Sequence, residues 1–182
     1  MTPDAWLLTA AVVLVVLAAW TGWTLIRLRR LEDRAARAWT ALDTQLQRRA
    51  VLAEELALDF PVAVGEGRAA FLAAFAADAR APVDGDRELS ENVLGRELRE
   101  LPAALPGAPS EFREHLTGTS ARVGLARRFY NDAVRDTRAL RRRRLPRLLR
   151  LHGSRPLPRY FDIDERLDVP DGRGGSAGNR RG

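Results

Sequence analysis

The amino-terminal part of the chain is one unbroken apolar stretch. No charged residue lies between Asp4 and Arg27, so residues 5–26 carry only small, aliphatic, aromatic or hydroxyl side chains. As a helix rising about 1.5 Å per residue, this stretch is roughly 33 Å long, which is enough to cross a hydrocarbon core of about 30 Å. We therefore predict a transmembrane helix at residues 5–26.

A buried core helix and a cleaved signal peptide are the two other structures that contain such a stretch. A domain of this size cannot surround a helix that is apolar on every side. The residues before the stretch include no Arg or Lys, and the stretch is longer than the apolar region of a typical signal peptide. In addition, Trp6 at one end and Trp20 and Trp23 at the other stand where aromatic belts form in membrane proteins.

The charges beside the apolar stretch predict its orientation. Only Asp4 and the amino terminus precede it, whereas five basic residues follow it closely: Arg27, Arg29, Arg30, Arg34 and Arg37. The positive-inside rule places the amino terminus outside and the rest of the chain in the cytoplasm. We expect an extracytoplasmic tip at 1–4, a cytoplasmic helical domain at 27–165 and a disordered Gly-rich tail at 166–182.

Beyond residue 26 the apolar positions recur every three or four residues, which is typical of amphipathic helices. One such stripe runs from Leu28 to Phe60, so the apolar stretch is predicted to continue directly into a long helix that ends at Pro61. Two shorter helices are expected at 66–80 and 87–101, with a turn between them.

A second long helix is predicted after the Pro-rich loop at 102–110. Ser110 is its expected N-cap, and its apolar stripe extends to about residue 149. No segment shows the strict alternation or the β-branched runs that are typical of strands. The predicted fold class is all-α, with one N-terminal transmembrane helix followed by two long and two short helices.

Composition narrows the possible chemistry. The chain has no Cys, so it can form no disulfide and no thiolate metal site, and its two His residues, His115 and His152, are far apart. We therefore expect no catalytic, metal or cofactor site, and the chain is predicted not to be an enzyme.

The 30 basic residues outnumber the 24 acidic ones, giving a net charge of +6. All the basic residues are Arg, which together with abundant Ala, Leu and Gly indicates a GC-rich bacterial genome.

The basic residues gather near the end of the second long helix, where residues 138–159 contain nine Arg and no acid. If the long helices are antiparallel and Phe60 lies beside Glu111, then Leu28 lies beside Arg143 and the run reaches the cytoplasmic headgroup layer. Each basic residue near an anionic bilayer surface contributes about 1 kcal/mol. The expected membrane-surface cluster consists of Arg27, Arg29, Arg30, Arg141, Arg142, Arg143, Arg144, Arg147 and Arg150.

Two other interpretations of this run stay open. A solvated helix end would contain the same residues, because Arg is favourable at the negative end of a helix dipole. Nucleic-acid binding is the weakest interpretation, since no stacking aromatic side chains are interleaved with the basic ones, and no nucleic-acid partner is expected. The expected partners are the lipid bilayer, through anionic headgroups, and another membrane protein.

The same alignment of the long helices places Trp39 near Tyr130 and Asp43 near Arg128. We predict that these four residues form a polar and aromatic seam between the helices, with a binding site as the alternative.

The remaining polar residues are expected to be ordinary surface positions. Six are carboxylates without a nearby nucleophile or His: Glu54, Glu55, Asp59, Asp162, Asp164 and Glu165. His115 is expected to be an ordinary position on the second long helix.

Three blocks of the sequence resemble the LemA family of bacterial membrane proteins. Residues 39–49 (WTALDTQLQRR) are similar to that family's first-helix signature, and residues 126–136 (ARRFYNDAVRD) to the signature of its last long helix. Residues 158–165 (PRYFDIDE) resemble its closing segment. The blocks follow the family's order and extend over the helical domain.

The resemblance implies one amino-terminal span, an antiparallel four-helix domain and no known catalytic residue. It favours a non-catalytic scaffold or adaptor at the inner face of a bacterial cell membrane. The alternative is an accessory component or substrate of a membrane protease or envelope-stress complex. The chain departs from the family pattern at residues 50–55 (AVLAEE), where the family usually has His-Asp-Leu, and at Ser120 and Ala121, where Glu-Asn is common. No role that depends on those polar groups is implied here.

Overall fold

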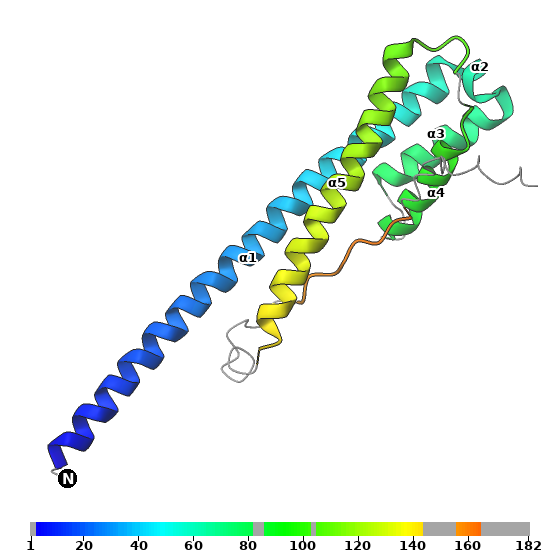
Figure 1. Ribbon diagram of the computed structural model, residues 1–182. Coiled ribbons are helices and arrows are strands. Elements are labelled where there is room, and N and C mark those ends of the chain that lie inside the picture. Colours follow the sequence, from blue (N-terminus) through cyan, green and yellow to red (C-terminus); the bar gives the residue numbers. More distant parts are fainter. Residues whose placement is uncertain (1–2, 82–85, 103–104, 144–155, 165–182) are drawn as a thin grey trace, which may run out of the picture.

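The computed structural model describes residues 3–81, 86–102, 105–143 and 156–164. Within these ranges all the regular structure is helical (Figure 1). The helices are α1 (Pro3–Asp59), α2 (Pro61–Val64), α3 (Glu66–Arg80), α4 (Arg87–Arg99) and α5 (Ser110–Arg141). For the described part of the chain, the prediction of an all-α fold is confirmed.

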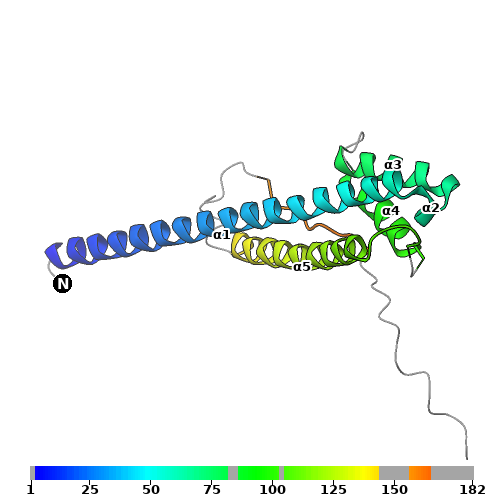
Figure 2. The ribbon, with the colours of Figure 1, turned by 90° about the horizontal axis from the view of Figure 1, so that it is seen from above.

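Helix α1 joins the apolar stretch and the amphipathic stretch in one continuous element of 57 residues. Its amino-terminal part extends well beyond the other helices, whereas α5 lies beside its second half (Figures 1 and 2). By length and composition, the extending part is long and apolar enough to cross a membrane, and none of its most apolar 18-residue window is buried. Its exposed large apolar side chains are Trp6, Leu7, Leu8, Val12, Val13, Leu14, Val15, Val16, Leu17, Trp23 and Ile26.

Helix α5 runs antiparallel to α1, and contacts at both ends of the pair show the register. Where α1 ends, the rings of Phe60 and Phe112 lie 5.6 Å apart between centroids. Towards the other end, Nη1 of Arg34 lies 3.6 Å from Oδ2 of Asp136. These pairs agree with the alignment that places Phe60 beside Glu111.

A chain reversal after α1 brings α3 back along it. Pro61 begins the short α2, and Gly65 then takes a φ of 95°, a left-handed conformation that glycine adopts without a steric cost. The core between α1 and α3 is rich in small side chains, which let the two helices approach closely. The buried alanines of this core are Ala50, Ala53, Ala57, Ala69, Ala76 and Ala79. Helix α4 packs mainly on α3.

Three helix boundaries differ from the sequence prediction. Helix α5 ends at Arg141 and not near residue 149. Helix α4 ends at Arg99, two residues earlier than expected. Leu101 comes just before Pro102, and the residue before a proline disfavours helical backbone. The expected N-cap role of Ser110 is wrong, since Ser110 is already helical. Pro109, with the extended ψ of 144° that the position requires, occupies the N-cap of α5.

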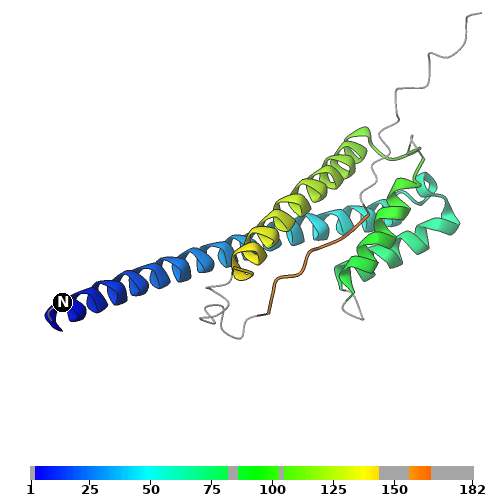
Figure 3. The ribbon, with the colours of Figure 1, turned by 60° about the horizontal axis from the view of Figure 1, so that its bottom comes forward.

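Residues 156–164 form an extended segment, which we call the strap. It runs from the carboxyl end of α5 back along the helices to α4 (orange in Figures 1 and 3). Phe161 and Ile163 are buried, whereas Tyr160, Asp162 and Asp164 are exposed, so the side chains alternate as they do in a strand. The strap therefore presents one apolar face to the helices although no sheet accompanies it in the described structure.

Candidate functional site

An aromatic cluster fills the contact between α1, α5 and the strap. The ring of Trp39 lies 5.2 Å from that of Tyr130, with an interplanar angle of 57°. Phe161 of the strap approaches Trp39 edge-on at 5.4 Å and 72°. Such tilted arrangements suit the quadrupoles of aromatic rings. The structure thus brings Trp39 and Tyr130 together as expected, and it adds Phe161 as a third member.

The polar atoms beside this aromatic cluster hold the backbone of the strap. Nδ2 of Asn131 donates to the carbonyl oxygen of Phe161 at 2.9 Å, and the amide of Phe161 donates to Oδ1 of Asn131 at 2.9 Å. The hydroxyl of Tyr130 donates to the carbonyl oxygen of Arg159 at 2.8 Å. These side chains satisfy backbone groups that a neighbouring strand would satisfy in a sheet.

The far end of the strap is bound by α4. The amide of Asp162 donates to Oε1 of Glu88 at 3.0 Å, and the amide of Asp164 donates to Oδ1 of Asn92 at 2.7 Å. The strap therefore ties α5 to α4 through its backbone. This role was not predicted from the sequence. The prediction that no segment alternates is wrong for residues 161–164, where apolar buried and polar exposed side chains alternate.

The structure pairs Asp43 with a different arginine from the expected Arg128. Oδ1 of Asp43 lies 2.5 Å from Nη1 of Arg87, at the start of α4. Arg128 and Tyr130 are two residues apart on α5, so they lie about 200° apart around its axis. Because Tyr130 faces Trp39 on α1, Arg128 is directed away from that contact.

A buried ion pair joins α1 to α4. Nη2 of Arg49 donates to Oε2 of Glu91 at 2.6 Å, and the two side chains are 8% and 0% exposed. Nε of Arg87 lies 3.8 Å from Oε1 of Glu91, so Asp43, Arg87, Glu91 and Arg49 form a continuous, charge-balanced chain across the α1–α4 contact. The signal for this network was the position of Arg49 within the apolar stripe of its helix, three residues after Leu46.

Burial shifts the titration of two groups at these contacts. Desolvation raises the pKa of Glu91 above its ordinary value, and the charge and hydrogen bond of Arg49 offset only part of this effect. Desolvation also raises the pKa of Tyr130, and the negative charge of Glu88 adds to that rise.

At the other end of the pair of long helices, Arg141 does not face a membrane surface. Its side chain is 5% exposed, its Nη2 pairs with the carboxylate of Glu32, and its Nη1 donates to the carbonyl oxygen of Pro156 at 3.0 Å. Arg141 follows Thr137 by four residues and so continues the stripe of α5 that packs on α1. Its assignment to the membrane-surface cluster is therefore corrected to an interhelical ion pair.

The other described members of that cluster are exposed: Arg27, Arg29, Arg30, Arg142 and Arg143. Arg27 lies over the ring of Trp23, with its guanidinium carbon 5.4 Å from the ring centroid. Because Arg141 pairs with Glu32, the exposed Arg residues of α1 and those that follow α5 lie at the same end of the helix pair. Arg144, Arg147 and Arg150 lie outside the described residues.

The described carboxylates and histidine that the sequence singled out lie in ion pairs or at the surface. Oε2 of Glu54 pairs with Nη1 of Arg80 at 2.5 Å, whereas Glu55, Asp59 and His115 are exposed. In the part of the chain that the structure describes, no group of three His, Asp or Glu residues is placed to hold a metal ion. Glu165 and His152 fall outside the described residues.

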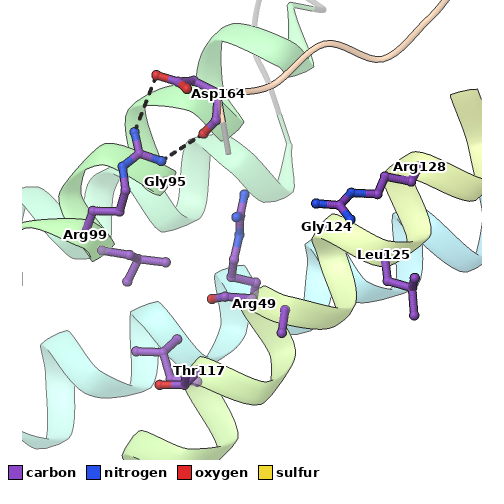
Figure 4. Close-up of a pocket in the computed structure, with 12 residues that line it drawn as sticks. Arg49, Gly95, Arg99, Thr117, Gly124, Leu125, Arg128 and Asp164 are labelled. Atoms are coloured by element: carbon purple, nitrogen blue, oxygen red, sulfur yellow. Dashed lines mark hydrogen bonds and ion pairs between the residues drawn. The ribbon is translucent and has the colours of Figure 1, made fainter. Parts of the chain in front are cut away.

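A cavity of about 390 Å³ opens between α1, α4, α5 and the end of the strap (Figure 4). Three helices each contribute one guanidinium group to it, those of Arg49, Arg99 and Arg128. Arg99 donates from Nη1 to the carbonyl oxygen of Asp164 at 2.8 Å, and its Nη2 lies 4.0 Å from that residue's carboxylate. The apolar part of the wall includes Leu98, Leu116 and Leu125.

The sequence did not predict this pocket, because its members are distant along the chain and follow no motif spacing. Ser120, where the chain departs from the family pattern, is part of its wall. Comparison of the chain with protein-family models, with curated proteins and with solved structures found no match.

Proposed function

We propose that the chain is a single-pass membrane protein of the LemA type, with a non-catalytic scaffold or adaptor domain at the inner face of a bacterial cell membrane. The observation that carries this proposal is the continuity of α1. The exposed apolar stretch passes without a break into the segment that packs on α3 and α5. An apolar surface this large is unfavourable in water, and a bilayer is the environment whose thickness matches it.

The helical domain is proposed to have the antiparallel four-helix arrangement of that family. Helices α1 and α5 supply the two long members, and α3 and α4 the two short ones. Contacts of α1 with α5 and α3, and of α3 with α4, support this arrangement. In it, α2 is a single turn that reverses the chain.

An orientation with the domain in the cytoplasm is supported by the exposed basic residues beside the apolar stretch. Arg27, Arg29 and Arg30 follow the stretch directly, and Arg142 and Arg143 reach the same level through the antiparallel register of α5. The five charges would lie at the anionic headgroups of the inner leaflet.

A single-cysteine experiment tests the span and its orientation. The chain has no native Cys, so Asp4→Cys and Ala41→Cys, both at exposed positions, each provide one thiol. In intact bacterial cells, a membrane-impermeant maleimide should label Asp4→Cys and leave Ala41→Cys unlabelled until the membrane is permeabilised. The reverse pattern would overturn the orientation, and release of the protein by carbonate washing would overturn the span.

A scaffold or adaptor role requires a partner that binds the domain. Cross-linking in cells followed by purification in detergent should recover one membrane protein in a fixed ratio to the chain. Recovery of a membrane protease subunit, or cleavage of the chain by one, would favour the alternative role in a protease or envelope-stress complex.

A further inference from the structure

The pocket between α1, α4 and α5 is surrounded by more positive than negative charge. Arg49 is balanced by Glu91, and Arg99 is balanced by Asp164. Arg128 has no ion-pair partner among the residues that the structure describes, and its guanidinium group points across the cavity towards that of Arg49 (Figure 4). An anion in this cavity would complete the charge balance.

Arg49 has donor capacity that the protein itself does not use. Nη2 is engaged by Glu91, whereas Nε is buried without a hydrogen-bond partner. A guanidinium group carries five donors in a planar fork that matches a carboxylate. Leaving a buried donor unsatisfied is costly, so an acceptor that enters beside Arg49 gains more than one that binds at an exposed Arg.

A glycine keeps space open between two of the guanidinium groups. Gly95 lies in the interior of α4, where glycine costs about 1 kcal/mol relative to alanine. A Cβ at this position would lie 3.6 Å from Nη1 of Arg99 and 4.0 Å from Nη1 of Arg49, which is ordinary van der Waals contact. The packing of the protein alone does not require glycine here. Its effect is to leave room for an atom between the two cationic groups.

We propose that this pocket binds a small aliphatic carboxylate. The carboxylate would lie beside Gly95 and accept hydrogen bonds from Arg49 and Arg128. Its hydrocarbon chain would contact the leucines of the wall, Leu98, Leu116 and Leu125. The volume of about 390 Å³ is within the range of roughly 300–1,000 Å³ that is usual for small-molecule sites.

The position of the pocket favours a water-soluble ligand over a lipid headgroup. Arg49 follows the end of the apolar stretch by 23 residues of continuous helix, a distance of about 35 Å along the axis. A headgroup in a bilayer that surrounds residues 5–26 cannot reach it. Binding of the carboxylate does not require the domain to lie on a particular side of the membrane.

Ligand-observed NMR titration of the full chain in phosphatidylcholine nanodiscs tests this proposal. The probe is hexanoate, with hexanamide as its uncharged analogue and inorganic phosphate as an oxyanion without a hydrocarbon chain. We expect saturable binding of hexanoate above the background of empty nanodiscs. Hexanamide and phosphate should each bind at least tenfold more weakly.

Three variants locate the binding. Arg128→Gln removes an exposed charge and should weaken hexanoate binding about ten- to hundredfold, as expected for the loss of a charge-assisted contact. Gly95→Ala should weaken it at least fivefold while the thermal midpoint of the protein stays equal or rises. Arg135→Gln, on the same helix as Arg128 but outside the pocket, should bind hexanoate as the natural chain does.

Four results would overturn the proposal. They are the absence of saturable hexanoate binding, equal binding of hexanamide, binding of phosphate as tight as that of hexanoate, and unchanged hexanoate binding in Arg128→Gln or Gly95→Ala. The thermal midpoint keeps the Gly95→Ala result interpretable, because a variant that is folded and more stable but binds less has lost the site and not the fold.

Discussion

Arg49 on α1 and Glu91 on α4 form an ion pair that is closed to solvent, with a distance of 2.6 Å between Nη2 and Oε2. Helix α4 packs mainly on α3, so this pair and its neighbour Asp43–Arg87 are the polar ties between α4 and the long helix. A buried ion pair contributes little to net stability, but removing either partner alone is strongly destabilising because the other charge is left buried. The pair therefore fixes where α4 lies against α1.

Removing one member of this pair should destabilise the domain strongly. Glu91→Ala leaves the Arg49 charge buried and uncompensated, and we expect the free energy of unfolding to fall by about 3–5 kcal/mol. The double variant Arg49→Met, Glu91→Leu should lose much less, because both charges are gone. Urea unfolding followed by circular dichroism measures both. Glu54→Ala, which breaks the more exposed pair with Arg80, is the control and should cost at most about 1 kcal/mol.

The raised pKa of Glu91 predicts a pH dependence of stability. The folded protein holds the Glu91 proton more tightly than the unfolded chain does, so the free energy of unfolding falls as pH rises from the ordinary pKa of 4.5 through the raised one. Glu91→Gln cannot titrate and lacks this component. The stability of the natural chain relative to Glu91→Gln should therefore decrease as the pH rises above 4.5, and it should level off once the pH exceeds the raised pKa of Glu91. An increase over that range would mean that the Arg49 charge outweighs burial.

The aromatic cluster should contribute measurably to the α1–α5 contact. Trp39→Ala removes the ring that touches both Tyr130 and Phe161. Because Trp39 is only partly buried, we expect a loss near the lower end of the usual range, about 3 kcal/mol. Thermal and urea unfolding provide the measurement. Phe129→Ala, at an exposed neighbouring position, should change the stability by less than about 0.5 kcal/mol, and an equal loss in the two variants would contradict the described packing.

Asn131 should control how readily the strap leaves the helices. Asn131→Ala removes both hydrogen bonds to Phe161, so the segment around the exposed Arg159 should open more often. Limited trypsin digestion with mass spectrometry should show faster cleavage after Arg159 in this variant. Asp132→Ala, which loses only an exposed contact with Arg135, should be cleaved at the natural rate.

Anionic lipid should stabilise the domain through Arg142 and Arg143. If both lie at headgroups only when α5 is packed on α1, phosphatidylglycerol nanodiscs should raise the free energy of unfolding above its value in neutral nanodiscs. Arg142→Gln with Arg143→Gln should remove up to about 2 kcal/mol of this gain, at roughly 1 kcal/mol for each charge. Raising the salt concentration should also reduce it. An equal gain in the double variant would assign these residues to a solvated helix end.

Much of the helical architecture could be predicted from the sequence because it depends on periodicity. The steps of three and four residues from Leu28 to Phe60 specified one long helix, and antiparallel pairing then placed Trp39 near Tyr130. The pairing of Asp43 failed for a geometric reason. Alignment gives the level of a residue along a helix, whereas its partner also depends on the direction in which it points.

The polar network and the pocket could not be predicted from the sequence in the same way. Arg49, Glu91 and Arg128 belong to three helices, and their proximity depends on how α4 packs, which local patterns do not encode. The sequence prediction placed Arg141 in the membrane-surface cluster because it lies within a run of Arg residues. Its position on the buried stripe, four residues after Thr137, was the better guide to its environment.

Helix α1 has no break between the apolar stretch and the part that packs on α3 and α5, and this continuity has a mechanical consequence. A straight helix transmits tilt and rotation, so the apolar part that is proposed to span the bilayer would turn together with the domain as one rigid body. Inserting one residue near Arg34 would rotate the domain by about 100° relative to the apolar stretch, and inserting a second would roughly double that angle. The number of residues in α1 between the apolar stretch and the domain therefore sets the direction in which the pocket faces in the plane of the proposed membrane.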